Sequence, residues 1–194
     1  MIIIGIDNGL DGGIAAVSIG GEVLLVRATP TAKPANGKTN RRLHYESEMV
    51  TILENLKSLR GRDGSLQAYI EFAQAMPVIR KGKPTEGVQG TASAFTFGVG
   101  HGLWRGMLAA LGVPYTIVHP KTWQKEMFKD IRKVKDTKKA SIITAGRLFP
   151  KVNLLPSGKA RKESHGMSDA LLMAEYGRRQ IVRKRNDESG HLTA

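Results

Sequence analysis

The sequence predicts an α/β fold built on a mixed five-stranded sheet, three antiparallel strands and then two further strands, with helices on both faces. Two apolar runs, residues 1–6 and 14–19, flank a glycine-rich loop, and a two-glycine spacing leads to a third run at 23–27, as in an antiparallel meander. Two later β-type runs, 66–72 and 114–118, alternate with stretches of helical spacing. The predicted element order is therefore β-β-β-α-β-α-β-α, where the last α stands for the helical C-terminal part of the chain.

Apolar spacing and small residues place the helices. Residues 45–59 carry an apolar stripe at helical spacing, and residues 91–111, rich in alanine and glycine, are predicted as one long helix. The glycines of the second segment cost helix stability, so we expect another helix to pack very close to it. Three further helices are predicted, over residues 121–128, 138–149 and 167–182.

Segments poor in apolar residues mark loops and the end of the domain. Residues 29–42 and 77–90 combine lysine and arginine with proline and glycine, and both are predicted to be basic loops. The first is either a solvated linker or a nucleic-acid contact. We expect a single domain over residues 1–183, followed by a disordered basic and polar tail over 184–194.

The charge balance of the chain indicates its class of partner. Lysine and arginine number 30 against 17 aspartate and glutamate residues, a formal charge of +13, which points to a polyanion such as nucleic acid or an anionic membrane surface. The sequence has no apolar stretch of membrane-spanning length and no signal-peptide pattern, which favours nucleic acid and a cytoplasmic setting. It has no cysteine, which excludes disulfides and cysteine zinc sites.

Three carboxylates stand in apolar surroundings, where charged side chains are rare unless paired or bound to metal. Asp7 follows the first strand, Glu71 ends the fourth, and Asp169 opens the last helix, four residues after His165. Three of these four side chains have an ordinary structural explanation: a turn for Asp7, compensation of the helix dipole for Asp169 and a cap for His165. Glu71 is harder to explain, because its own strand offers no cation. Their combination indicates a functional site.

Carboxylates gathered on a basic protein suit phosphodiester hydrolysis. This reaction needs a water made nucleophilic and a leaving oxygen that is stabilised. Two Mg²⁺ ions about 3.5–4 Å apart do both, and such hard cations prefer oxygen ligands. Lysine and arginine side chains would hold the phosphate backbone. The sequence therefore predicts a metal-dependent nuclease.

Three short motifs carry a resemblance to a known family. They are Ile4-Gly5-Ile6-Asp7-x-Gly9, Tyr69-Ile70-Glu71 and His165-x-x-x-Asp169-Ala170-Leu171-Leu172-Met173-Ala174. Together with residues 102–123 they resemble RuvC-type Holliday junction resolvases of the ribonuclease H-like superfamily, in the form carried by bacteriophages. The likeness covers residues 1–180 in motif order.

The resemblance implies a metal-dependent homodimer that nicks symmetric strands of a four-way DNA junction during recombination and repair, in a bacterial or phage-infected cytoplasm. Asp7, Glu71 and Asp169 match the metal-binding acids of the family, and His165 matches the fourth position. The spacing from His165 to Asp169 is one residue longer than in the common bacterial pattern, which leaves Glu163 as an alternative. The 91–111 helix matches the dimer interface.

We hypothesise distinct roles for the four side chains. Asp7, expected at the centre of the sheet, would bridge two Mg²⁺ ions, for which Mn²⁺ would substitute; Glu71 would bind one ion and Asp169 the other. His165 would be a ligand or a proton carrier, since its ordinary pKa of about 6.5 permits both.

The resemblance also implies that residues 74–83 enter the junction, with Met76 or Phe72 as a wedge between bases, although core packing is favoured for Phe72. Trp104 and Trp123 could stack on bases, but helix packing is favoured for both. The candidates for phosphate contacts are Lys33, Lys38, Arg41, Arg42, Arg80, Lys81, Lys83, Lys121, Lys159, Arg161 and Lys162.

Three other functions are compatible with parts of this pattern. A ribonuclease H acting on RNA–DNA hybrids shares the arrangement of acids. A catalytically silent junction-binding protein would need the basic residues but not the acids. The actin-like and sugar-kinase ATPases share the Asp-x-Gly hairpin, but that fold needs two such domains, for which 194 residues are too few.

Overall fold

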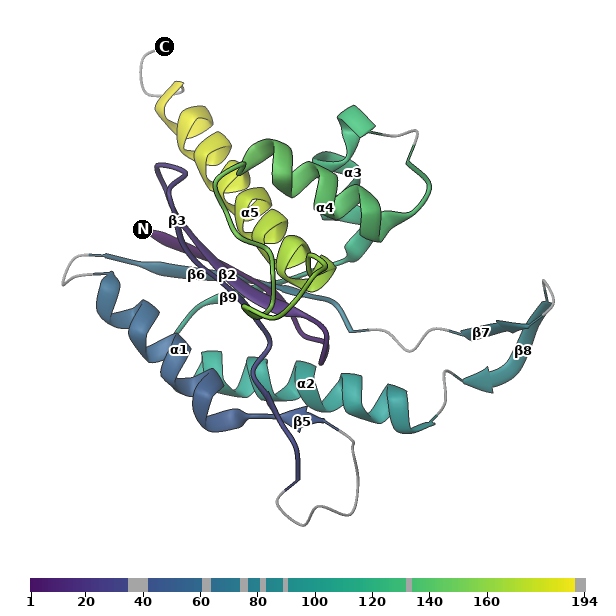
Figure 1. The fold of residues 1–194 in the computed structure, drawn as a ribbon. Coiled ribbons are helices and arrows are strands. Elements are labelled where there is room, and N and C mark those ends of the chain that lie inside the picture. The colour runs from purple at the N-terminus through teal and green to yellow at the C-terminus, as the bar shows by residue number, and fades with distance from the viewer. Residues whose placement is uncertain are drawn as a thin grey trace.

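A five-stranded mixed sheet forms the centre of the computed structural model (Figure 1), which describes residues 1–34, 42–60, 64–73, 77–80, 83–88, 91–131 and 134–190. The strand order is β3-β2-β1-β6-β9. Strands β1 (Ile2–Asp7), β2 (Gly13–Ser18) and β3 (Val23–Ala28) are antiparallel neighbours, and β6 (Leu66–Glu71) and β9 (Tyr115–Val118) run parallel to β1. The predicted mixed sheet is confirmed.

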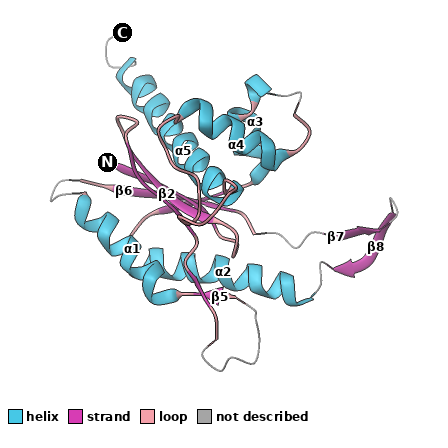
Figure 2. Cartoon of the chain, viewed as in Figure 1, coloured by secondary structure: helices cyan, strands magenta, loops and turns pink. Residues whose placement is uncertain are grey.

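Helices cover both faces of this sheet, as predicted (Figures 1 and 2). Helices α1 (Glu46–Leu59) and α2 (Thr91–Ala110) lie on one face. The other face carries α3 (Pro120–Met127), a 3₁₀ turn at Lys129–Ile131, α4 (Thr137–Leu148) and α5 (His165–Gly190). Asp136 caps α4, since its carboxylate accepts the backbone N–H groups of Lys138 and Lys139.

Two short strand pairs lie beside the main sheet. β4 (Thr31–Ala32), in the first basic segment, pairs with β5 (Leu43–His44), which follows that segment directly. In the second, β7 (Pro77–Arg80) pairs with β8 (Lys83–Val88) in an antiparallel hairpin beyond the start of α2 (Figure 1). The prediction of a loop over 77–90 was therefore wrong for these strands, since β-branched Val78 and Ile79 favour extended backbone despite the neighbouring prolines and glycines.

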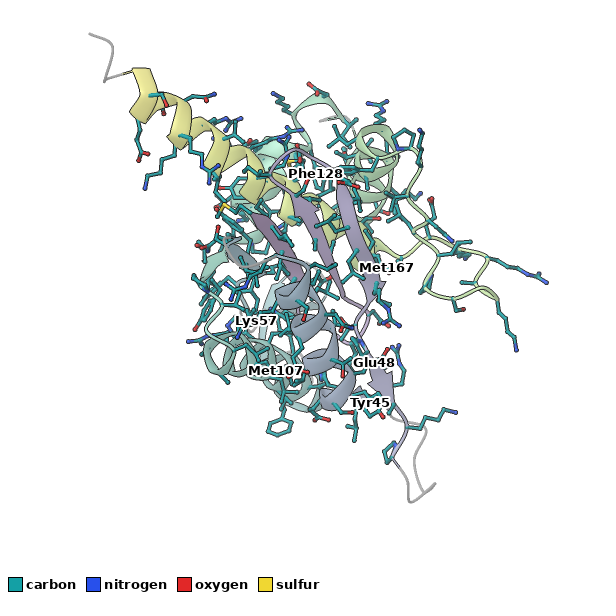
Figure 3. All side chains as sticks on the ribbon, turned by 90° about the vertical axis from the view of Figure 1, so that its left-hand side faces the viewer. Tyr45, Glu48, Lys57, Met107, Phe128 and Met167 are labelled. Atoms are coloured by element: carbon teal, nitrogen blue, oxygen red, sulfur yellow. The ribbon has the colours of Figure 1, made fainter. Side chains whose placement is uncertain are left out.

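Two hydrophobic cores, one on each face, explain the uninterrupted apolar run of β1. Ile4 and Ile6 point toward α1 and α2, whereas Ile3 points toward α5, and all three are fully buried. Figure 3 shows Met107 of the first core and Phe128 and Met167 of the second on either side of the sheet.

Glycine permits the very close packing of α5 on β1. A Cβ at Gly5 would lie 2.0 Å from the carbonyl oxygen of Ala170 and 2.5 Å from the nitrogen of Ala174. A Cβ at Gly166, in the first turn of α5, would lie 2.1 Å from the carbonyl oxygen of Asp11 in the β1–β2 turn. These contacts set the distance between the start of α5 and the end of β1.

The C-terminal segment differs from its prediction, because α5 continues to Gly190. Residues 184–190 are therefore helical rather than a disordered tail, and residues 191–194 lie outside the described part. Two ion pairs lie along this part of α5: Arg183 binds Glu126 of α3 at 2.8 Å, and Lys184 lies 3.9 Å from Glu188 one turn later. Within the described residues, the helices lack the length and apolar character needed to cross a membrane.

The contact between β1 and α5 predicts a large effect of Gly5→Ala. The added methyl group meets backbone atoms that cannot rotate away, so we expect the free energy of unfolding to fall by about 3 kcal/mol. Gly146→Ala is the matched control, because Gly146 of α4 is exposed and its Cβ would meet no described atom within 4 Å. The free energy of unfolding of this control variant, measured in urea, should rise by up to about 1 kcal/mol. Equal effects of the two changes would contradict this account.

Candidate metal centre

The two strand-borne acids lie together at one edge of the sheet. Asp7 is the last residue of β1 and Glu71 the last residue of β6. These strands are adjacent and parallel, with Ile6 paired to Ile70, so their carboxyl ends place the two acids side by side. Asp7 is 9% exposed, and the backbone N–H of Gly9 donates to its Oδ1 at 3.1 Å.

The first turn of α5 brings the other two predicted residues to the same edge. His165 is the first residue of α5, and Asp169 lies one turn later on the same face. Asp7, His165 and Asp169 each offer a ligand atom within 4.8 Å of the others. Glu71 lies next to this group, since its carboxylate interacts with those of Asp7 and Asp169. Glu163, the alternative to His165, is exposed.

Burial favours the protonated forms of all three acids. It raises the pKa of Asp7 to about 6 and that of Asp169 to about 7. Burial also raises the pKa of Glu71 to about 8, and the negative charges of Asp7 and Asp169 add to this rise. Burial lowers the pKa of His165, and the positive charge of Lys138 lowers it further.

These side chains form a donor set that suits a divalent cation. Carboxylate oxygens are the ligands that Mg²⁺ and Mn²⁺ prefer, and a neutral imidazole can complete the set. Asp7 is buried and Glu71 and Asp169 are half-buried, so their carboxylates repel one another unless protons or cations compensate them. Lys138 at the start of α4 interacts with Asp7, Asp169 and His165, but it is exposed and supplies one charge. The arrangement therefore fits a metal centre.

Sequence reasoning missed the contacts that hold Glu71. The indole N–H of Trp123, from α3, donates to Glu71 Oε1 at 3.2 Å. The side-chain amide nitrogen of Asn8 donates to the backbone oxygen of Glu71 at 2.7 Å and lies 3.1 Å from Nδ1 of His101 in α2. Only the burial of Trp123 was predicted. Nothing in the local sequence around Asn8, His101 or Lys138 indicates these contacts.

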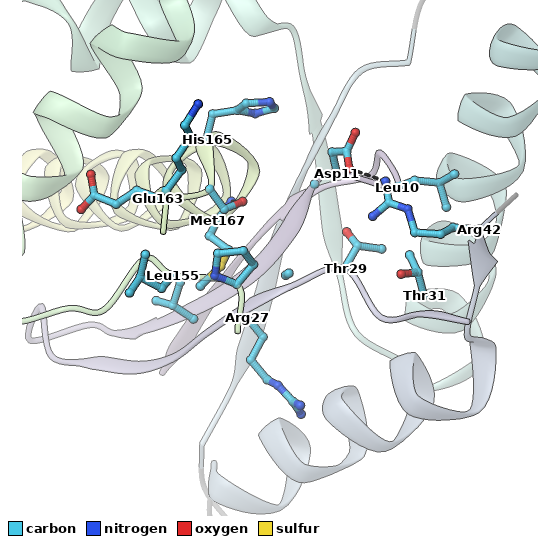
Figure 4. A pocket seen from close by; sticks show the side chains of 16 residues that line it. Leu10, Asp11, Arg27, Thr29, Thr31, Arg42, Leu155, Glu163, His165 and Met167 are labelled. Atoms are coloured by element: carbon cyan, nitrogen blue, oxygen red, sulfur yellow. Dashed lines mark hydrogen bonds and ion pairs between the residues drawn. The ribbon is translucent and has the colours of Figure 1, made fainter. Parts of the chain in front are cut away.

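A groove of about 680 Å³ begins beside His165 (Figure 4). It lies between the β1–β2 turn, the end of β3 and the segment leading into α5. Arg42 lines one side of it in an ion pair with Asp11, and Lys162 lies on the segment before α5. The groove thus connects two of the predicted phosphate-binding residues with His165, whereas Asp7, Glu71 and Asp169 do not line it.

The other predicted phosphate contacts are spread more widely. Lys33, Lys121, Lys159 and Arg161 are exposed on the surface. For Arg80 and Lys83 only the backbone is described, in β7 and β8. Lys38, Arg41 and Lys81 lie outside the described residues, as does the proposed wedge Met76.

The structure corrects the prediction for Phe72. Its side chain is 41% exposed rather than packed in the core, and it stacks on His119 with ring centroids 6.0 Å apart. Phe72 follows the last paired residue of β6, so it lies past the end of the sheet. Trp104 and Trp123 are both fully buried, as their predicted packing role requires.

Comparison with known structures identifies the fold. RuvC of Thermus thermophilus in complex with a Holliday junction substrate matches with a TM-score of 0.55 and 16% sequence identity, over 91% of this chain and 92% of that chain. The chain shares the fold of RuvC. A second structure of T. thermophilus RuvC matches over the same shares with a TM-score of 0.47 and 17% identity. The predicted mixed-sheet fold is thus confirmed as the fold of RuvC.

Sequence comparison alone finds no such likeness. Neither models of protein families nor curated protein sequences match the chain. The likeness to RuvC therefore rests on the short sequence motifs and on the arrangement of the strands and helices.

The raised pKa values predict how stability depends on pH and metal. An acid whose pKa is higher in the folded than in the unfolded protein stabilises the fold at pH values below its unfolded-state pKa, which is near 4. This stabilisation is lost as the pH rises through the folded-state pKa. The metal-free protein should therefore lose stability between about pH 4 and pH 8, through the values of about 6, 7 and 8 for Asp7, Asp169 and Glu71.

Mg²⁺ should reverse this loss, because it competes with protons for the same carboxylates. We expect the gain in melting temperature from Mg²⁺ to be small at pH 5 and largest at pH 8, as measured by scanning calorimetry. A gain that does not depend on pH would show that Mg²⁺ binds elsewhere.

Proposed function

We propose that this protein is a metal-dependent, structure-selective endonuclease that resolves four-way or branched DNA junctions by paired symmetric nicks. The observation that carries the proposal is the convergence of Asp7, His165 and Asp169 within 4.8 Å, beside Glu71. The RuvC fold and the charge of +13 support it, because a solved RuvC holds a Holliday junction substrate and a basic surface attracts DNA.

The four side chains would hold two divalent ions, Mg²⁺ or Mn²⁺, with Asp7 between them, Glu71 on one and Asp169 on the other. Such ions activate a water and stabilise the leaving oxygen of a phosphodiester. Asp7 is held by the N–H of Gly9 and Glu71 by Trp123, so neither carboxylate needs to be ordered when DNA arrives. His165 would act as a further ligand or carry the proton of the departing strand.

The groove beside His165 would receive the backbone of the cleaved strand. Arg42 and Lys162 would bind its phosphates, with Arg42 exchanging its ion pair with Asp11 for a phosphate. Lys33, Lys121, Lys159 and Arg161 would contact the arms of the junction, together with the basic residues of the β7–β8 hairpin and of segment 35–41. These contacts position the DNA without reading its sequence.

Two copies of the chain would cut the two symmetric strands. We propose that they associate through α2, where Cβ positions at Gly98, Gly102 and Gly106 would meet no described atom within 4 Å. These glycines recur every four residues on one exposed face, next to Phe95, which is 70% exposed. Gly100 does not belong to this face, since it packs on the backbone of Asn8 within the same chain.

Asp7→Asn tests the proposed reaction. The variant keeps the shape of the side chain and the acceptor for Gly9, but loses the charge that would bind metal. We expect cleavage of a synthetic four-way junction in Mg²⁺ to fall below detection, with junction binding intact. Because a buried charge is removed, the metal-free variant should also unfold at a higher temperature than wild type at pH 8.

Asp187→Asn, an exposed carboxylate near the end of α5, is the control and should cleave normally. A fork and an RNA–DNA hybrid are tested beside the junction. Cleavage of the hybrid alone would favour a ribonuclease H. Wild-type cleavage by Asp7→Asn would remove the proposed metal centre, and junction binding with no Mg²⁺-dependent nicking would indicate a silent binding protein.

Salt dependence tests the groove. With the Asp7→Asn protein, the logarithm of the binding constant should fall with the logarithm of salt concentration by about 0.9 for each phosphate contact on duplex arms. Adding Arg42→Ala or Lys162→Ala should each reduce this slope by about 1, as measured by fluorescence anisotropy. Lys184→Ala, at the far end of α5, should leave the slope unchanged. An unchanged slope in the two groove variants would remove the groove from the DNA path.

A further inference from the structure

Glu71 is the only one of the three acids whose carboxylate accepts a hydrogen bond from a tryptophan in the described part of the chain. Trp123 Nε1 lies 3.2 Å from Glu71 Oε1, and Trp123 is 0% exposed. Its ring packs edge-on against Phe128, with centroids 5.5 Å apart. The donor is therefore fixed in place by the packing of α3, which begins two residues after β9, the strand next to β6.

The backbone of Glu71 is fixed separately. Asn8, which follows Asp7 and is 0% exposed, donates from its side-chain nitrogen to the Glu71 carbonyl oxygen at 2.7 Å. The same nitrogen lies 3.1 Å from Nδ1 of His101, which links it to α2. Asn8 thus ties the ends of β1 and β6 together, and Trp123 then decides where the Glu71 carboxylate points.

We propose that Trp123 is a positioning residue for the metal centre: its indole N–H holds Oε1 of Glu71 so that the other carboxylate oxygen alone faces the cation. The inference rests on the proposed function, because it assumes that Glu71 is a metal ligand. An indole N–H can only donate, and a buried donor that loses its acceptor is costly, so Trp123 keeps Oε1 when a cation arrives. Partners of this kind orient ligands and tune metal affinity.

The chain provides a matched control for this role. It contains two tryptophans, and Trp104 of α2 is also 0% exposed. Trp104 packs in the core on the opposite face of the sheet, and its Nε1 has no hydrogen-bond partner among the described residues. Trp104→Phe and Trp123→Phe therefore remove the same atoms from equally buried sites. Only the second removes a donor to Glu71.

Mn²⁺ binding to the full chain, measured by titration calorimetry without DNA, tests the inference. We expect Trp123→Phe to weaken Mn²⁺ binding by about tenfold to a hundredfold. Trp104→Phe should stay within about twofold of wild type, even if both variants lose similar melting temperature. The readout does not depend on cleavage, so it separates positioning of a ligand from a general loss of activity.

Tryptophan fluorescence provides a second measurement, whose decisive variant is Trp104→Phe, in which Trp123 stays in place. In Trp104→Phe the remaining emission comes from Trp123, and saturating Mg²⁺ should change its intensity or wavelength, because a cation would draw charge from the carboxylate that the indole contacts. In Trp123→Phe the emission of Trp104 should not respond.

Each outcome bears on a different claim. Wild-type Mn²⁺ affinity in Trp123→Phe, or an equal loss in Trp104→Phe, would overturn the role of Trp123 and leave the metal centre standing. An unresponsive Trp123 in a Trp104→Phe protein that binds Mn²⁺ would overturn it as well. A wild-type protein that binds no Mn²⁺ would overturn the proposed function, and this inference with it.

Discussion

The repulsion among three clustered carboxylates, one buried and two half-buried, is the constraint on which the rest of this structure depends. Asp7, Glu71 and Asp169 come from two strands and a helix, and burial raises the pKa of each. Such a cluster opposes folding at neutral pH unless cations compensate it. The close packing of α5 on β1 at Gly5 holds the acids together against this repulsion. The fold thus gives up stability to maintain a site that attracts cations.

Neutral donors hold two acids of this cluster, and its nearby cation Lys138 is exposed to solvent. Gly9 donates to Asp7 and Trp123 to Glu71, while Asn8 holds the backbone of Glu71. Each contact orients a ligand without neutralising it. Basic side chains lie further out, where Arg42 and Lys162 line the groove beside His165. This separation of neutral inner contacts from a basic periphery suits a protein that holds metal and DNA together.

Local pattern predicted the elements and the identities of the candidate ligands. Glu71 was informative because its own strand offers nothing that explains an acid there. Two expectations were wrong: Phe72 is exposed because it lies past the end of β6, and residues 184–190 continue α5 instead of forming a disordered tail. The glycines of α2 were predicted to face one closely packed helix. In the structure Gly100 packs against Asn8 of the same chain, whereas a Cβ at Gly98 would meet no described atom within 4 Å.

The sequence by itself determined the periodicity of strands and helices, the strongly positive charge and the presence of acids in apolar surroundings. These depend on residues close together in the chain, where backbone geometry fixes which side chains share a face. Only the tertiary structure decided that Asp169 and His165 reach Asp7, and that Trp123 and Asn8 hold Glu71. Those contacts join residues far apart in sequence, and their distances follow from how α3 and α5 pack on the sheet, which no local pattern encodes.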